Sequence, residues 1–142
     1  MGTSGDNTQP GNRILIGTDP VFHFFQGGNE IIRDGLAFAG ALPNRTGVYL
    51  DFTCADNGGG LALLNLLSIG SGAWSQNTFP PCGGSVSVIA SVAPFIDTNT
   101  TDLQGWGCSV HESFPTFRSD WSALAVATDT PTTPTCGNDV VS

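Results

Sequence analysis

Lysine is absent from this chain, and charge of either sign is scarce. Four arginines are the only strongly basic residues, and 12 acidic residues leave a formal net charge of −8. Charged residues make up 11% of the 142 residues, less than half the usual fraction of about 25%. Nucleic acid and anionic membranes bind to basic patches, so we expect the protein to bind neither. The polar surface must consist of Thr, Ser, Asn, Gln and Gly, a composition common in secreted and cell-surface proteins.

Two further absences concern membranes and metals. No apolar run approaches the roughly 20 residues that a membrane-spanning helix needs, so we expect no membrane insertion. No Cys-x-x-Cys motif is present, so the usual zinc spacing is missing. The four widely spaced cysteines, Cys54, Cys82, Cys108 and Cys136, instead predict two disulfides in an extracellular protein. Of the three possible pairings, Cys54–Cys82 and Cys108–Cys136 are favoured because each closes a local loop; four reduced thiols are the alternative.

The length suits one folded domain with a core of its own. Residues 1–12 are rich in Gly, Asn, Ser and Thr, and are predicted to form a flexible N-terminal arm. Residues 130–142 are rich in Thr and Pro, which is typical of a linker-like C-terminal tail. The predicted domain therefore comprises residues 13–129.

Hydrophobic periodicity predicts an α/β domain. Apolar or β-branched runs predict four strands, over residues 12–18, 47–54, 85–93 and 121–128. Spacings of three and four residues predict an amphipathic helix over 30–41, with Asn29 as its N-cap and Glu30 in its first turn. A second helix is expected over 61–69 and a short helical turn within 97–107, whereas 70–84 and 108–120 are expected to be loops.

Strands that alternate with helices are typical of a parallel sheet. The predicted fold is therefore a small, mostly parallel sheet of about four strands, with helices on its faces, stabilised by two disulfides. The segment from Leu61 to Ile69 (residues 61–69) is apolar on nearly all sides. Because a surface helix would show a polar stripe, this segment is expected to mediate self-association or contact with another surface protein.

Ligands of parallel sheets bind beyond the carboxyl ends of the strands. Side chains suited to binding or acid–base chemistry follow the first three predicted strands: Asp19, His23, Cys54, Asp56, His111 and Glu112. Asp19 with His23 and His111 would hold a divalent metal or orient a base. The alternative is that His23, which stands among three phenylalanines, closes a hydrophobic loop with its nitrogens bonded to the backbone.

Cys54 is placed between a strand and a helix, where a nucleophile would stand, and His111 with Glu112 would complete a Cys/His/Glu arrangement. A disulfide at Cys54 would exclude this chemistry. The glycines at 58–60 form neither a GxGxxG motif nor a P-loop, so they are interpreted as a tight turn and no cofactor is expected.

Two parts of the chain resemble a group of large secreted bacterial and archaeal surface proteins. One is ILIGTDPVFH at residues 14–23, where the group has an apolar strand running into G-H-D-P-D-x-H. The other comprises PFIDTNTTDLQGWGCSVHESF and SDWSALAVATDTPTTPTC. The resemblance implies a flavodoxin-like or class I glutamine amidotransferase-like fold and an extracellular location. It marks Asp19, Pro20, His23, Trp106 and His111, while Thr18 and Val21 stand where the motif has His and Asp.

Three functional hypotheses follow. The first is a non-catalytic structural or adhesive domain of a secreted protein, cell surface or filament. The second is a module that binds carbohydrate or another polar ligand, with Trp74, Trp106 and Trp121 stacking on sugar rings and Asp19, His23, Asp56 and His111 beside them. The third is a hydrolase or amidotransferase that uses Cys54 or a histidine-bound metal. The non-catalytic reading is preferred.

Overall fold

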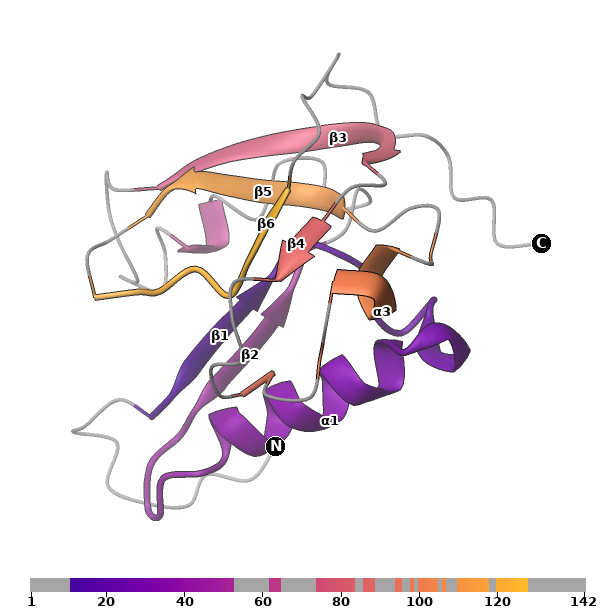
Figure 1. Cartoon of the computed structure of the whole chain (residues 1–142). Helices are drawn as coiled ribbons and strands as arrows, with labels where there is room; N and C mark the ends of the chain where they lie inside the picture. The colour runs from indigo at the N-terminus through magenta and orange to yellow at the C-terminus, as the bar shows by residue number, and fades with distance from the viewer. Residues whose placement is uncertain are drawn as a thin grey trace.

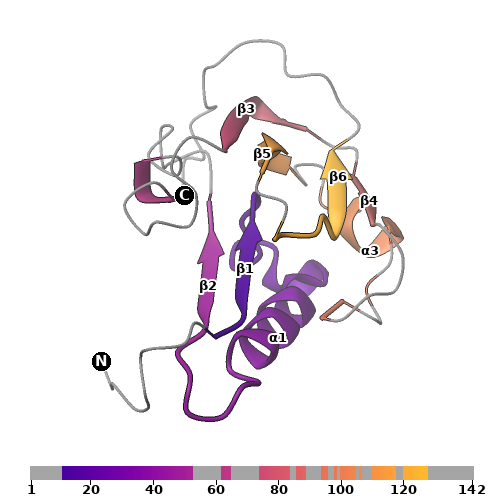
Figure 2. The same ribbon diagram turned by 90° about the vertical axis from the view of Figure 1, so that its left-hand side faces the viewer.

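The structure, a computed structural model, describes residues 11–52, 62–64, 74–83, 86–88, 94–95, 98, 100–104, 106, 110–117 and 120–127. Its elements in chain order are β1 (Arg13–Ile16), the 3-10 helix η1 (Phe24–Gln26), α1 (Gly28–Ala39), β2 (Val48–Asp51), β3 (Ser75–Gly83), β4 (Val86–Val88), α3 (Thr100–Gln104), β5 (Val110–Thr116) and β6 (Ala125–Ala127). Residues 62–64 are also helical. β1 and β2 lie side by side along α1, and β3 and β5 lie beyond their carboxyl ends (Figure 1 and Figure 2).

The prediction of one mostly parallel sheet of about four strands is wrong. The described strands form three separate pairs: β1 and β2 are parallel, whereas β3 with β5 and β4 with β6 are antiparallel. Only β1, α1 and β2 keep the expected strand–helix–strand unit. The order of elements along the chain does not fix which strand edges pair, and here the later strands pair with one another.

The loops predicted over 70–84 and 108–120 are also wrong, because β3 and β5 occupy them. Two prolines, Pro80 and Pro81, argue against a strand, since proline has no N–H to donate to the ladder. They fall where the register of the pair shifts, between Thr78 and Gly83. An irregular stretch of ladder does not need those two donors, so the strand tolerates both prolines.

Other predictions on single elements have mixed outcomes. The strands over 12–18 and 47–54, the helix over 30–41 and the turn within 97–107 are confirmed as β1, β2, α1 and α3. The helix begins at Gly28, with Gly27 as its N-cap, so the prediction of Asn29 as the cap is wrong, while Glu30 lies in the first turn as expected. Within the last two predicted strands, 85–93 and 121–128, the described strand residues are those of β4 and β6.

Several predictions concern residues that the structure does not describe. These are residues 1–10 of the N-terminal arm, the C-terminal tail and most of the segment 61–69; the last two residues of the predicted arm, Gly11 and Asn12, are described and are hydrogen-bonded to Thr46 and Val48. No disulfide bond occurs among the described residues: Cys54, Cys108 and Cys136 lie outside them, and only the backbone of Cys82 is described. Disulfide stabilisation is therefore not part of the described fold. None of the helices in the described ranges has both the length and the apolar character required to span a membrane.

The core lies on both faces of β1. Ile14 and Ile16 pack with Ile31 of α1 and with Trp106 in one cluster. Leu15, which lies between them in the strand, packs against the second cluster, formed around Phe52 and Leu64. Successive side chains of a strand point to opposite faces, so the run Ile14–Leu15–Ile16 supplies both clusters. This is why a short continuous apolar run predicted the strand correctly.

Gly17 joins β1 to β5. Its carbonyl oxygen accepts hydrogen bonds from the backbone N–H groups of His111 and Glu112, each at 2.9 Å. A Cβ atom at Gly17 would collide with the carbonyl oxygen of Glu112 and lie 2.8 Å from its carbonyl carbon. Only glycine therefore permits this close approach of two backbones.

We expect Gly17→Ala to lower the free energy of unfolding by about 1–3 kcal/mol, because the added methyl group must push β5 away from β1. Gly40→Ala is the matched control: Gly40 has φ −85°, and the nearest atom to an added Cβ is the carbonyl oxygen of Leu36 at 3.4 Å. Urea unfolding of both variants measures the difference. Equal effects of the two substitutions would show that the contact does not constrain the fold.

Tyr49, the one tyrosine of the chain, is packed between β2 and α1. A Cβ atom at Gly35 of α1 would lie 2.6 Å from Tyr49 Cε2. The phenol oxygen is buried and has no hydrogen-bond partner in the described part of the chain. Burial, and to a smaller extent the Asp51 carboxylate, raise the pKa of Tyr49 from 10.0 to about 12.

We expect stability to fall as pH rises from about 10 to about 12. Over that window the unfolded chain releases the phenol proton while the folded protein retains it. Because Tyr49 is the only tyrosine, the ultraviolet absorbance of tyrosinate follows it directly. The native protein should titrate near pH 12 and the denatured chain near 10, and Tyr49→Phe should remove this part of the alkaline loss. Coincident titrations would contradict the burial of the phenol.

Candidate functional site

The segment that follows β1 brings together three of the predicted site residues. Asp19 Oδ1 lies 3.1 Å from His111 Nε2 and 3.5 Å from His23 Nε2. Asp19 and His23 belong to the segment after β1, whereas His111 comes from β5, 92 positions from Asp19. The Gly17 junction places β5 against this segment and so sets His111 beside Asp19.

His23 is held from two other sides. Its Nδ1 lies 2.6 Å from Gln26 Oε1, and its ring stacks on Trp106 with centroids 4.6 Å apart and planes at 16°. Trp106 Nε1 in turn donates to the backbone oxygen of Gln26 at 2.7 Å. Asp19, His23, Gln26, Trp106 and His111 thus form one contiguous group, which we call the Asp19 cluster. His23 Nε2, at 3.5 Å from Asp19 Oδ1, has no hydrogen-bond partner among the described residues.

The backbone of the segment is fixed as well. The carbonyl oxygen of Asp19 accepts from the N–H groups of Phe22 and His23, and the carbonyl oxygen of His23 accepts from those of Gln26 and Gly28. Gly27 adopts φ 103°, a left-handed conformation that favours glycine. Gly27 thereby lets the chain turn from η1 directly into α1.

The arrangement of one carboxylate and two imidazoles has the components of an acid–base site. However, the exposed fraction is 0% for His111 and 3% for His23. A general base must reach a proton on its substrate, and these rings are covered by the protein itself. Among the described residues, no group of three or more His, Cys, Asp and Glu side chains is placed to hold a metal ion. The burial of both imidazole rings favours a structural role for the Asp19 cluster.

Glu112, another predicted site residue, has a different side-chain partner. Glu112 is adjacent to His111, but its carboxylate accepts a hydrogen bond from Gln76 Nε2 at 2.8 Å, and it lines a cavity on whose walls His111 is not found. Glu112 thus contacts Gln76, whereas His111 contacts Asp19, and the Cys/His/Glu arrangement stays a prediction. Cys54 and Asp56 lie outside the described residues.

The tryptophans do not form a flat platform for a sugar. Trp106 is buried beneath His23. Trp74 and Trp121 are partly exposed, but their rings meet edge to face at 5.1 Å, and the Arg13 guanidinium covers the Trp121 ring at 5.3 Å. Stacking on sugar rings by all three tryptophans is not supported by these contacts.

Apolar side chains of the same segment point outward from the Asp19 cluster. Phe25 is 95% exposed, and Val21, Phe22 and Phe24 are also exposed. Burying any of them would remove apolar surface from water, which is favourable. We call these four residues the aromatic knob. From the sequence, we singled out His23 in this loop and did not identify the knob or Gln26. The phenylalanines on both sides of His23 were the available signal.

Comparison with models of known protein families, with curated proteins and with solved structures finds no match to this chain. The resemblance to secreted surface proteins therefore stays a prediction. Function must be inferred from the side chains that the fold brings together.

We expect Asp19→Asn to lower the free energy of unfolding by about 1–3 kcal/mol, because it weakens the contacts of a mostly buried carboxylate with two imidazoles. Asp34→Asn is the matched control, since Asp34 pairs with an exposed arginine, Arg33, and such pairs contribute about 1 kcal/mol or less. Thermal and urea unfolding compare the two. If Asp19→Asn proved as mild as Asp34→Asn, the cluster would not support the loop.

Proposed function

We propose that this domain is a non-catalytic interaction module of a secreted or cell-surface protein, and that it self-associates through the aromatic knob. The observation that carries the proposal is the exposure of Val21, Phe22, Phe24 and Phe25 on one short segment. Aromatic side chains are enriched at the centres of protein interfaces, where they supply large apolar contact areas.

The support of the knob favours binding. Binding costs conformational entropy when a loop must be ordered on contact. Here the loop is already fixed by its backbone hydrogen bonds, by the positive φ of Gly27 and by the Asp19 cluster beneath it. The buried polar side and the exposed apolar side of the segment thus act together, one as a support and the other as the contact.

The charge of the chain restricts the kind of partner. Residues 20–29 include no Asp, Glu, Lys or Arg, although the chain as a whole carries −8. Two copies repel through their charged surfaces, and this repulsion is screened by salt. The knob offers an uncharged face at which a second copy binds through apolar contact, so association should strengthen as ionic strength rises.

Low charge, the absence of lysine and a surface rich in Thr, Ser and Gly support the extracellular setting of the proposal. The segment 61–69, expected from its sequence to contact partners, lies mostly outside the described residues. The knob provides a separate surface whose side chains are described. A structural or adhesive role requires such a surface and needs no exposed acid–base group.

We expect Phe25→Ser to weaken self-association about tenfold or more, as loss of a central aromatic contact does. The free energy of unfolding of this variant should change by no more than about 0.5 kcal/mol, because the Phe25 side chain is exposed in the monomer. Sedimentation equilibrium over a range of protein and salt concentrations gives the association constant. Leu36→Ser is the matched control, since Leu36 is 54% exposed on α1 and is not part of the knob.

Three results would overturn the proposal. The unaltered protein would stay monomeric at every concentration and salt level, or both serine variants would weaken association equally. Alternatively, the protein would sediment with neutral phospholipid vesicles in a Phe25-dependent way, which would assign the knob to a membrane surface.

A further inference from the structure

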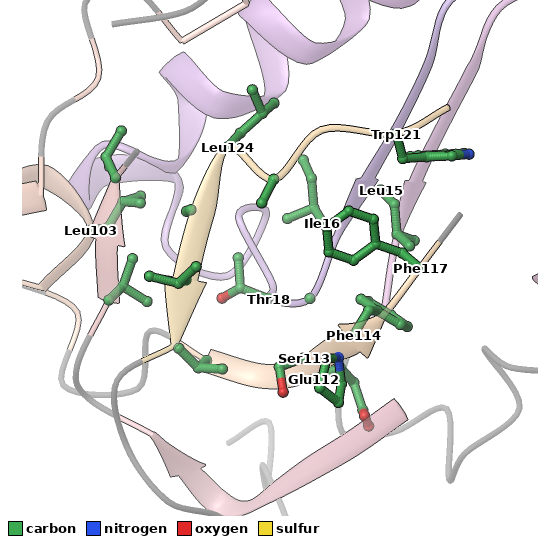
Figure 3. A pocket seen from close by; sticks show the side chains of 18 of the residues that line it. Leu15, Ile16, Thr18, Leu103, Glu112, Ser113, Phe114, Phe117, Trp121 and Leu124 are labelled. Atoms are coloured by element: carbon green, nitrogen blue, oxygen red, sulfur yellow. The ribbon is translucent and has the colours of Figure 1, made fainter. Parts of the chain in front are cut away.

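A cavity of about 460 Å³ lies between β1, β5, β4 and the segment 121–126. Its walls are mostly apolar, with Leu15 and Ile16 on one side, Leu103 and Leu124 on another, and the aromatic rings of Phe114, Phe117 and Trp121 beside them (Figure 3). The lining includes Phe117 and Val126, which are exposed, so the cavity communicates with solvent. Ligand pockets typically have volumes of about 300–1,000 Å³.

Two hydroxyl groups in the lining have no hydrogen-bond partner in the described part of the chain. Thr18 and Thr98 both line the cavity, and their side-chain oxygens have no hydrogen-bond partner among the described residues. The residues are only 8% and 7% exposed, and Figure 3 shows Thr18 in the middle of the ring of lining side chains. Buried polar groups are nearly always hydrogen-bonded, so two unsatisfied hydroxyls beside one cavity point to an occupant that bonds them.

The lining also indicates the charge of that occupant. Glu112 is the one charged residue among the described residues that line the cavity, and it is 3% exposed. The described part of this lining contains no cationic side chain that would compensate an anion, and burying an unpaired charge is costly. Threonine hydroxyls both donate and accept hydrogen bonds, so they match a ligand hydroxyl.

From these observations we propose that the cavity is a binding site for an uncharged, ring-sized molecule that carries a hydroxyl group. Its apolar body contacts the aliphatic and aromatic walls, and its hydroxyl exchanges hydrogen bonds with Thr18 and Thr98. This site is independent of the aromatic knob, because none of the four knob residues lines the cavity. Phe25→Ser should therefore leave binding in the cavity unchanged, so the two proposals fail separately.

Three probes of similar shape test the site in the full chain: benzyl alcohol, ethylbenzene and benzoate. We expect benzyl alcohol to bind and to shift the nuclear magnetic resonance signals of the Trp74 and Trp121 indoles, which line the cavity, but not that of Trp106, which does not. Ethylbenzene, which has no hydroxyl, should bind roughly threefold to tenfold more weakly. Benzoate should bind at least about tenfold more weakly, because its charge would be buried beside Glu112.

Variants assign the hydroxyl contact. Thr18→Val keeps the shape of the side chain. It should weaken the binding of benzyl alcohol roughly threefold to tenfold without weakening the binding of ethylbenzene. Thr98→Val gives a second, separate test. Thr116→Val is the matched control, because Thr116 is exposed and does not line the cavity.

Either of two outcomes would overturn the proposal. The first is that no probe shifts the two indole signals, which would show that water fills the cavity or that the cavity is closed in solution. The second is that benzyl alcohol and ethylbenzene bind equally to the unaltered protein and to both valine variants, which would leave the hydroxyls no part in recognition.

Discussion

The contact between Gly17 and the β5 backbone is the constraint on which the described structure depends. One carbonyl oxygen accepts hydrogen bonds from two successive N–H groups, those of His111 and Glu112, at a separation that a Cβ atom would prevent. The contact ties the parallel β1–β2 pair to the antiparallel β3–β5 pair. It also sets His111 beside Asp19 and Glu112 in the wall of the cavity. Both proposed binding surfaces therefore adjoin a single junction of two backbones.

The segment after β1 buries a polar side chain and exposes apolar ones. The histidine is buried and the phenylalanines next to it are exposed, the reverse of the distribution that their hydrophobicity favours. Burial of an imidazole is costly unless it is paired, and here Asp19, Gln26 and Trp106 supply the contacts of His23. The phenylalanines make edge-to-face contacts, Phe22 with His23 and Phe24 with Phe25, and stay exposed. This contrast is the physical reason to place binding on the outside of the loop and support on its inside.

The three small strand pairs also explain the cavity. A single continuous sheet buries its faces against helices as one layer. Where separate strand pairs meet, side chains have to fill the space at their junction. β1, β4 and β5 each contribute lining residues. Thr18 and Thr98 line this space, and their hydroxyl groups have no hydrogen-bond partner among the residues that the structure describes. Close packing is the norm in protein interiors, so an apolar cavity lined by these hydroxyl groups is the basis of the proposed binding site.

Local pattern in the sequence determined β1, α1, β2 and the short helix α3, because each depends on periodicity or on residues close in the chain. It also placed Asp19, His23 and His111 together, although it did so through the edge of a four-stranded parallel sheet, whereas the described strands form three separate pairs and His111 lies in the antiparallel strand β5. Tertiary structure alone decided the pairing of β3 with β5, the burial of both histidines, the exposure of Phe25 and the cavity around Thr18 and Thr98. These features arise from contacts between residues far apart in the chain, as between Asp19 and His111. No local pattern records such contacts, because the free energy that selects them comes from backbone hydrogen bonds and packing that exist only once the strands have met.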